Sequence, residues 1–195
     1  MWVKICGITN LEDALCAVKC GADALGFVFY PKSPRYISPQ YAHEIVKQLP
    51  LHVEKIGLFV ETSPEEINLT CKEARMDKAQ IHFDVDEDFL KALAFPYLRV
   101  VRAKNPNDVT RFAETLRLVD AHVQSFGGEG ERLSLSWFEK SDNSRIILAG
   151  GLSALNIEEV KPLGFYGVDV SSGVEQRKGI KDHVKVKAFL QKAKA

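Results

Sequence analysis

The sequence predicts a single-domain (β/α)8 TIM barrel that spans residues 1–195. Three observations predict this fold. Short apolar segments typical of strands alternate eight times with segments of helical periodicity. The strands are rich in Val, Ile, Leu and Phe, as parallel strands covered on both faces require. Polar side chains and glycines follow directly after the strands, and in a barrel the carboxyl ends of the strands meet at one mouth.

The predicted strands span 3–6, 24–29, 54–60, 79–82, 98–102, 116–120, 145–149 and 168–171. The predicted helices span 11–20, 39–49, 64–75, 86–94, 106–113, 134–141, 154–160 and 182–192. Asn10, Ser38 and Ser63 are good N-caps for the first three helices. Eight units in 195 residues make a compact barrel, since the usual length is about 250 residues. A doubly wound sheet is the alternative, but residues 7–9 lack its glycine fingerprint.

Composition excludes several classes of function. The 26 basic and 26 acidic residues balance, which argues against a general binder of nucleic acid or of anionic membranes. No apolar run reaches the roughly 18 residues of a membrane span, and polar residues interrupt the N-terminal segment where a signal peptide would be apolar. We therefore expect a cytoplasmic protein. The four cysteines show no CxxC spacing, so no zinc site and no disulfide framework is predicted.

The residues at the predicted strand ends form the candidate site. If the chain is a barrel, they all face one pocket. One polar residue at a strand end would mean little, but polar groups follow most of the strands. The candidates are Cys6, Arg35, His82, Arg102, Asp120, Gly150, Gly151, Ser171, Ser172 and Gly173.

Strand alternation adds a buried ion pair to this picture. Lys4 shares a strand face with Cys6, and Asp169 shares one with Ser171. Barrel closure makes the first and last strands neighbours, and a buried lysine requires a partner. We therefore expect Asp169 to neutralise Lys4. The alternative is that one of the two points to solvent at the rim.

The clearest ligand signal lies in the last third of the chain. Gly150 and Gly151 follow the seventh strand, and Ser171, Ser172 and Gly173 follow the eighth. Glycines let the backbone approach an anion, and N–H groups and hydroxyls can then hold a phosphate. Barrels often bind phosphate with these two loops, so we expect a small phosphorylated substrate here.

Three further candidates carry alternatives. Asp120 ends an apolar run, so its pKa is expected to rise towards that of a general acid, although a turn or N-cap role is equally compatible. Arg35 follows two prolines, Pro31 and Pro34, which stiffen a loop that suits a carboxylate clamp, or else it is exposed. His82 is a candidate binding or catalytic group, or a polar residue at the edge of the core.

The chain resembles the phosphoribosylanthranilate isomerase family in a series of motifs along its whole length. The motifs are KICGITN at 4–10, GADALGFVF at 21–29, SPRYI at 33–37, QIH at 80–82, Asp120, GGEG at 127–130, GGL at 150–152 and VDVSSGVE at 168–175. The resemblance implies a cofactor-free Amadori rearrangement of N-(5-phosphoribosyl)anthranilate in tryptophan biosynthesis. It implies Cys6 as general base, Asp120 as general acid and Arg35 as the group that holds the anthranilate carboxylate. It also places phosphate at the two C-terminal loops, and His82 and Asp169 among the substrate-binding residues.

Three departures from the family pattern concern loops and remove no catalytic group. Phe83 follows the QIH motif where the family usually has glycine, Ser136 replaces an aspartate, and Phe126 stands where tyrosine is common.

Other functions fit less well. A related aldose–ketose isomerase would have aspartate at position 6, and a metal-dependent epimerase would need more His and Asp ligands. A non-catalytic barrel that binds a phosphorylated metabolite could dispense with Cys6 and Asp120. No metal is expected, and the chain is expected to act as a monomer or homodimer.

Overall fold

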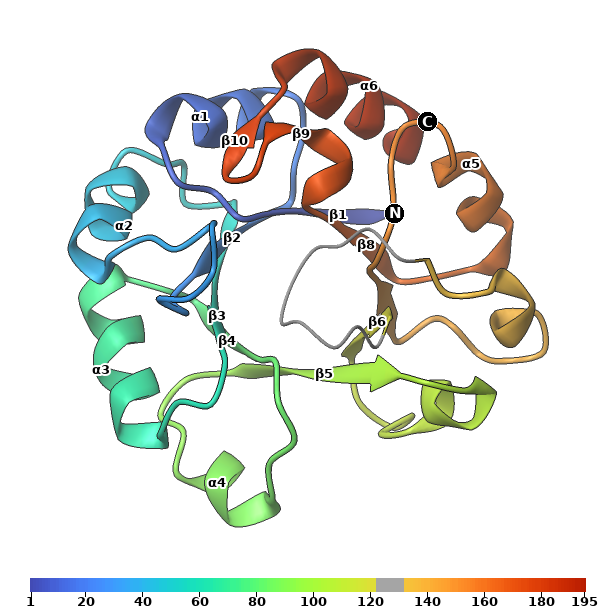
Figure 1. Ribbon diagram of the computed structural model, residues 1–195, viewed down its shortest axis with the longest axis horizontal. Coiled ribbons are helices and arrows are strands. Elements are labelled where there is room, and N and C mark those ends of the chain that lie inside the picture. The colour runs from blue at the N-terminus through green and yellow to red at the C-terminus, as the bar shows by residue number, and fades with distance from the viewer. Residues whose placement is uncertain (122–131) are drawn as a thin grey trace.

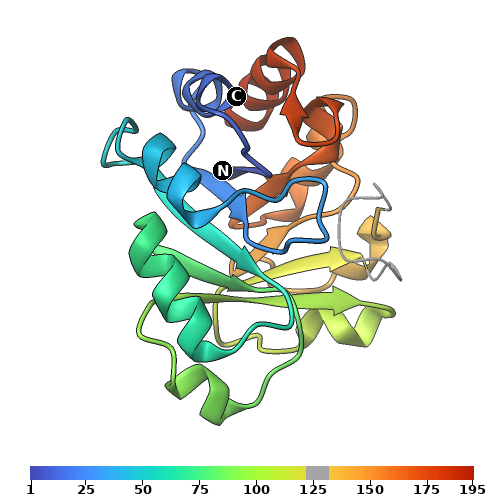
Figure 2. The same ribbon diagram turned by 60° about the vertical axis from the view of Figure 1, so that its left-hand side comes forward.

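A closed barrel of parallel strands forms the centre of the protein. The computed structural model describes residues 1–121 and 132–195. Strands β1 to β8 follow one another around the barrel in sequence order, and β8 pairs with β1. Figure 1 looks down this barrel and shows the helices outside the strands, and Figure 2 turns the same view by 60°. The predicted fold class is confirmed.

The strands are β1 (Trp2–Cys6), β2 (Ala24–Val28), β3 (Glu54–Phe59), β4 (Lys78–Ile81), β5 (Tyr97–Ala103), β6 (Arg117–Ala121), β7 (Ile146–Leu148), β8 (Gly167–Val170), β9 (Glu175–Arg177) and β10 (Ile180–Lys181). The α-helices are α1 (Leu11–Lys19), α2 (Pro39–Val46), α3 (Pro64–Ala74), α4 (Glu87–Lys91), α5 (Ile157–Val160) and α6 (His183–Lys194). The 3₁₀ helices are η1 (Pro106–Thr110), η2 (Leu135–Phe138), η3 (Lys161–Leu163) and η4 (Ser172–Val174).

The predicted N-caps start the first three helices. The side-chain oxygen of Asn10 accepts from the Asp13 N–H at 2.8 Å, and Ser38 and Ser63 cap α2 and α3 in the same way. Each of these bonds satisfies an N–H group that has no partner inside the helix. The caps thereby fix where each loop at the barrel mouth passes into its helix.

Two hydrophobic clusters stabilise the barrel. The larger one packs the outer faces of the strands against the helices. The smaller one fills part of the barrel interior and contains Leu98, Val100, Leu118, Ile147 and Ala149. Alternation along β5 and β6 puts Arg102 and Asp120 on the same inward faces as these residues. Along β5 and β6, the barrel interior is therefore apolar away from the mouth and polar at the mouth.

The helical predictions for the later units need correction. Segments 106–113 and 134–141 form only the 3₁₀ helices η1 and η2, and segment 154–160 is α-helical only from Ile157. The predicted helix 86–94 contracts to α4. At Arg111 the backbone is extended, with ψ of 134°, which ends η1, and Phe112 then turns left-handed with φ of 57°. Short segments contain too few turns to offset the cost of helix nucleation, so local contacts determine their form.

An antiparallel hairpin between β8 and α6 is absent from the sequence prediction. Strands β9 and β10 form a two-stranded sheet, and Gly179 in the turn between them has φ of +81°. The strand β8 also ends at Val170, one residue before the predicted end, because Ser171 leaves the extended region with ψ of −81°. The hairpin brings two charged side chains to the barrel mouth, as described below.

Candidate active site

Cys6 is the last residue of β1 and lies at the barrel mouth, where its side chain is 5% exposed. It pairs in register with Gly26 of β2. A Cβ atom on Gly26 would lie 2.7 Å from the Cys6 Sγ and 3.0 Å from the Lys4 Cε. Glycine at position 26 therefore leaves the space that the thiol and the lysine side chain occupy together.

The predicted ion pair between Lys4 and Asp169 is present. The Lys4 Nζ lies 2.7 Å from the Asp169 Oδ2, and the two side chains are 0% and 8% exposed. Burial alone would lower the pKa of Lys4, but the Asp169 carboxylate and the Cys6 side chain raise it overall. The ammonium group is therefore charged at neutral pH and lies low in the barrel beside Cys6.

The environment does not favour the Cys6 thiolate in the free protein. Burial raises the pKa of the thiol, and the Asp169 charge adds to this effect. The positive charges of Lys4 and Lys181 act in the opposite direction without reversing it. The thiol form therefore predominates at neutral pH before substrate binds.

Asp120 has the raised pKa that the sequence analysis predicts. Burial and the nearby Asp169 charge raise the pKa of its carboxyl to about 6, whereas the hydrogen bond from the Ala121 N–H opposes the shift. That N–H donates to the Asp120 Oδ1 at 2.8 Å. A carboxyl group with this pKa retains an appreciable protonated fraction near neutral pH, as a general acid requires.

His82 is buried just beyond the end of β4. Burial and the positive charges of Arg102 and Lys4 lower the pKa of its imidazole to about 4. The Gln80 Nε2 lies 3.5 Å from the His82 Nδ1. A neutral imidazole can bind substrate by hydrogen bonds, but it does not serve as a cationic acid at neutral pH.

Arg35 is buried and engages a side chain that the sequence analysis did not select. Its Nε and Nη2 each donate to a carboxylate oxygen of Glu175 at 2.8 Å. Although burial lowers the pKa of Arg35, the hydrogen bonds and charge of Glu175 raise it overall. The loop between β2 and α2 holds the Arg35 guanidinium at the barrel mouth. The contact of Arg35 with a substrate carboxylate stays a prediction.

The two C-terminal loops approach each other closely. Gly150 and Gly151 have φ of 89° and 61°, a region that favours glycine. A Cβ on Gly173 would lie 1.8 Å from the Leu152 carbonyl oxygen, so only glycine fits there. Within residues 1–121 and 132–195, the backbone N–H groups of Gly151 and Ser172 donate to no backbone acceptor. These loops therefore have the form that the predicted phosphate site requires.

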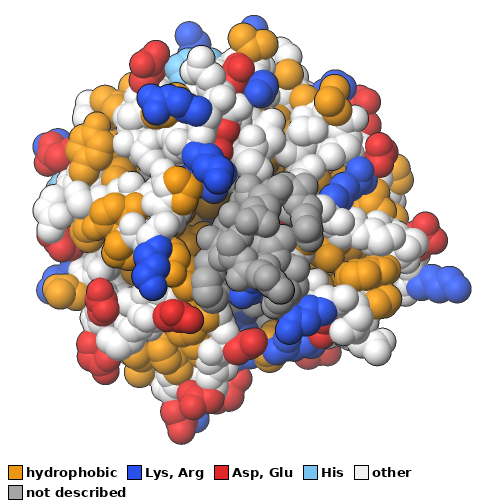
Figure 3. Space-filling view, in the orientation of Figure 1, with side chains coloured by type: hydrophobic (Ala, Val, Ile, Leu, Met, Phe, Trp, Pro, Cys, Tyr) orange, Lys and Arg blue, Asp and Glu red, His pale blue; other side chains and the backbone are white. Residues whose placement is uncertain are grey.

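The described residues also contain features that the sequence analysis did not identify. A pocket of about 500 Å³ lies over the ends of β3, β4 and β5. It is lined by Glu61, Phe83, Asp84, Val100, Arg102, Lys104, Asn105, Asp108 and Arg111. By strand order it faces the loops after β7 and β8 across the mouth. Figure 3 shows this face, with Lys and Arg side chains around its centre.

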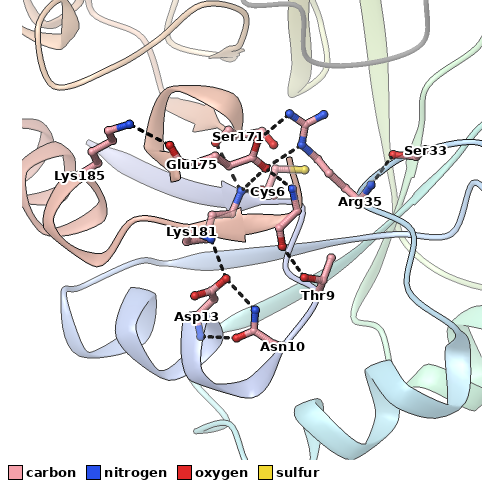
Figure 4. A network of polar contacts seen from close by, with 11 residues as sticks. Cys6, Thr9, Asn10, Asp13, Ser33, Arg35, Ser171, Glu175, Lys181 and Lys185 are labelled. Atoms are coloured by element: carbon pink, nitrogen blue, oxygen red, sulfur yellow. Dashed lines mark hydrogen bonds and ion pairs between the residues drawn. The ribbon is translucent and has the colours of Figure 1, made fainter. Parts of the chain in front are cut away.

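Glu175 and Lys181 of the β9–β10 hairpin complete the site, as Figure 4 shows. The only sequence signal for the hairpin is the Lys178–Gly179 pair between two short alternating segments, which is typical of a tight turn.

The motif at 127–130 and the departure at Phe126 lie outside the described residues. No group of three or more His, Cys, Asp or Glu side chains that could hold a metal occurs in residues 1–121 and 132–195.

Comparison with known proteins decides the family. The model of the family described as N-(5'-phosphoribosyl)anthranilate (PRA) isomerase matches residues 3–192. The chain belongs to the phosphoribosylanthranilate isomerase family. Membership confirms the predicted function as an isomerase of this family in tryptophan biosynthesis, over the alternatives of another aldose–ketose isomerase or a non-catalytic barrel. The loops after β7 and β8 and Cys6 all lie inside the matched residues.

Relatives in the phosphoribosylanthranilate isomerase family cover the whole chain. A curated N-(5'-phosphoribosyl)anthranilate isomerase from Nitratiruptor sp. is 61% identical, with 100% of this chain and 99% of the relative covered. One from Sulfurovum sp. is 59% identical, with both covered fully. The crystal structure of the Thermotoga maritima enzyme has a TM-score of 0.92 at 38% identity, with 100% of this chain and 98% of that chain covered. No described helix is long and apolar enough to cross a membrane.

Proposed function

We propose that this chain isomerises N-(5'-phosphoribosyl)anthranilate with Asp120 as general acid and Cys6 as general base. The observation that carries the proposal is the pairing of two groups at one barrel mouth. One is a carboxyl whose pKa is raised to about 6. The other is a thiol beside a buried ammonium group. Two titratable groups in different environments are the arrangement that acid–base isomerisation requires.

The chemistry needs an acid at the ring oxygen and a base at C2′. Asp120 donates its proton to the furanose ring oxygen as the bond from that oxygen to C1′ breaks, which leaves an open-chain iminium ion. The Cys6 thiolate then removes the proton from C2′, and the neutral enolamine forms. The 2′-hydroxyl group of the enolamine loses its proton as C1′ gains one, which gives the ketose. The substrate gains two protons and loses two, so substrate and product are isomers. The Lys4 ammonium offsets part of the cost of forming the thiolate in a buried site.

Anchoring at both ends would orient the substrate between acid and base. We expect the phosphate to bind at the backbone N–H groups of Gly151 and Ser172, where glycines let an anion approach. We expect Arg35 to contact the anthranilate carboxylate while Glu175 binds the Nε and Nη2 of Arg35. We expect the neutral His82 and the Asp169 carboxylate to contact the ribose hydroxyls. A solved relative in complex with reduced 1-(o-carboxyphenylamino)-1-deoxyribulose 5-phosphate supports a ligand of this class.

The Cys6→Ser variant tests the base. Serine preserves the approximate shape, but its hydroxyl is a far weaker acid, so kcat should fall by about two to four orders of magnitude with little change in KM. Turnover is followed through the fluorescence of the anthranilate adduct. The Cys71→Ser variant is the matched control, because Cys71 is buried on the outer side of the barrel in α3. Turnover of Cys6→Ser within about twofold of wild type would remove Cys6 from the mechanism.

Assembly and location stay predictions. We expect a monomer or a homodimer in the cytoplasm that binds no nucleic acid and no membrane. A Thermotoga maritima relative is described as dimeric, with engineered monomers also solved. Light scattering of the purified chain at micromolar concentration distinguishes the two assembly states.

A further inference from the structure

Lys181 lies at the end of β10, and its side chain is 0% exposed. Its Nζ donates to three oxygens: the Cys6 carbonyl at 2.6 Å, Glu175 Oε1 at 3.2 Å and the Ser171 carbonyl at 3.4 Å. An ammonium group has three protons, so these acceptors use its full donor capacity. The family resemblance assigned no role to this residue.

The three acceptors belong to three different parts of the proposed site, as Figure 4 shows. Cys6 is the proposed base at the end of β1. Ser171 begins the phosphate loop after β8. Glu175 holds both Nε and Nη2 of Arg35, the proposed carboxylate clamp. One ammonium group thus joins the base, the phosphate loop and the clamp.

The two cations of this cluster share one carboxylate. The Arg35 guanidinium and the Lys181 ammonium group both contact the Glu175 carboxylate. The buried Asp13 carboxylate accepts from the Lys181 backbone N–H at 2.8 Å, and its other oxygen lies 2.9 Å from the His183 Nε2. A buried cation in excess is costly unless an anion compensates it. The anionic groups of the substrate would supply that compensation, which distinguishes this cluster from an ion pair that only stabilises the fold.

Close packing restricts alternative positions for Arg35. A Cβ on Gly7 would lie 2.7 Å from the Arg35 Cδ, and one on Gly179 would lie 2.9 Å from the Pro34 carbonyl oxygen. The loops from β1, β2 and the hairpin therefore touch with little free space. A change at the centre of the cluster would move all of them.

We propose that Lys181 is a positioning residue of the isomerase reaction, which holds Cys6 and Ser171 by their carbonyls and orients Arg35 through Glu175. The inference rests on the proposed function, since it takes Cys6 as base and Arg35 as clamp. The positive charge of Lys181 also favours the Cys6 thiolate. The other charged groups around Cys6 are Lys4 on the same strand, Asp169 on β8 and Arg35 after β2.

The experiment compares Lys181→Met and Lys181→Arg with Lys178→Met, a control in the exposed turn of the same hairpin. Lys181→Met should lower kcat/KM by about 10²-fold, the typical effect of a misplacement of about 1 Å. Its rising limb of kcat/KM against pH should also shift to higher pH, because removal of a positive charge raises the pKa of the base. Lys181→Arg should keep that limb at the wild-type pH. Lys178→Met should match wild type.

Two inhibitors distinguish the two roles of Lys181, which are to orient Arg35 through Glu175 and to hold the loop at Ser171. Glu175→Gln should weaken competitive inhibition by anthranilate about tenfold, because Arg35 loses its carboxylate partner. It should leave inhibition by inorganic phosphate unchanged, because Lys181 keeps its bonds to the Cys6 and Ser171 carbonyls. Lys181→Met should weaken both. If Lys181→Met does not fold, as judged by circular dichroism, Lys181→Arg and Glu175→Gln still carry the test.

The inference is overturned if Lys181→Met has wild-type kcat/KM, or if its rising limb stays at the wild-type pH. Equal weakening of both inhibitors by Glu175→Gln would also overturn it. These outcomes leave the proposed function intact as long as Cys6→Ser is inactive. Full turnover by Cys6→Ser would instead refute the proposed function itself.

Discussion

Replacement of Asp120 by Asn should make the protein more stable while it removes activity. The pKa of the Asp120 carboxyl is raised from 3.8 to about 6 in the folded protein. Ionisation therefore costs more free energy in the folded state than in the unfolded chain. Asparagine cannot ionise, but its amide oxygen can still accept the 2.8 Å bond from the Ala121 N–H. The substitution removes the cost and keeps the local hydrogen bond.

The size of the effect depends on pH. Well below pH 3.8 the carboxyl is protonated in both states, so it contributes no difference in stability. As pH rises through 4 to above 6, the wild type loses about 1.4 kcal/mol for each unit of pKa difference. The full loss is about 2 to 3 kcal/mol above pH 7. We therefore expect Asp120→Asn to be more stable than wild type by about this amount at pH 7.5, and by little at pH 4.

Urea unfolding at pH 4, 5, 6 and 7.5 measures this difference through the midpoint and slope of each transition. A matched control is Asp88→Asn, which changes an 89% exposed carboxyl in α4. Its stability difference from wild type should show none of this pH dependence. The reasoning is wrong if Asp120→Asn is no more stable than wild type at pH 7.5, or if its advantage is the same at pH 4.

Two further perturbations test the geometry of the barrel mouth. Lys4→Met should cost about 3 to 5 kcal/mol of unfolding free energy because it leaves Asp169 buried without a partner. Adding Asp169→Asn should recover most of that cost in a double-mutant cycle measured by urea unfolding. The corresponding cycle on the exposed Lys91–Asp88 pair should give a coupling energy below about 1 kcal/mol. Gly173→Ala should weaken competitive inhibition by inorganic phosphate at least about tenfold, since a new Cβ would lie 1.8 Å from a backbone oxygen of the loop after β7. Unchanged phosphate inhibition would place the anion elsewhere.

The sequence predicts the barrel well because its signals are local and repeated. Alternation of apolar strands with capped helices identifies all eight units, and barrel closure alone predicts that Lys4 meets Asp169. The short helices after β5 and β6 are predicted less well. Few residues are involved there, so local features such as the Asn105 cap and the extended backbone at Arg111 determine whether an α-helix forms.

The polar cluster under the barrel mouth could not be predicted from the sequence. Glu175 and Lys181 look like ordinary surface charges between a strand and a helix. Their burial depends on the β9–β10 hairpin, which folds back beneath Arg35 and Cys6. The direction of the Cys6 pKa shift was also beyond sequence reasoning, because it depends on the balance between burial and the charges of Lys4 and Lys181.

The most direct test of the mechanism compares Cys6→Ser and Asp120→Asn on the cyclic substrate and on a ring-opened analogue. On the cyclic substrate both variants should lose about two to four orders of magnitude in kcat. On the ring-opened analogue Asp120→Asn should recover most of its activity, since ring protonation is bypassed, whereas Cys6→Ser should remain impaired because C2′ must still lose its proton. Equal losses for Asp120→Asn on both compounds, or recovery of Cys6→Ser on the open form, would contradict the assignment of acid and base.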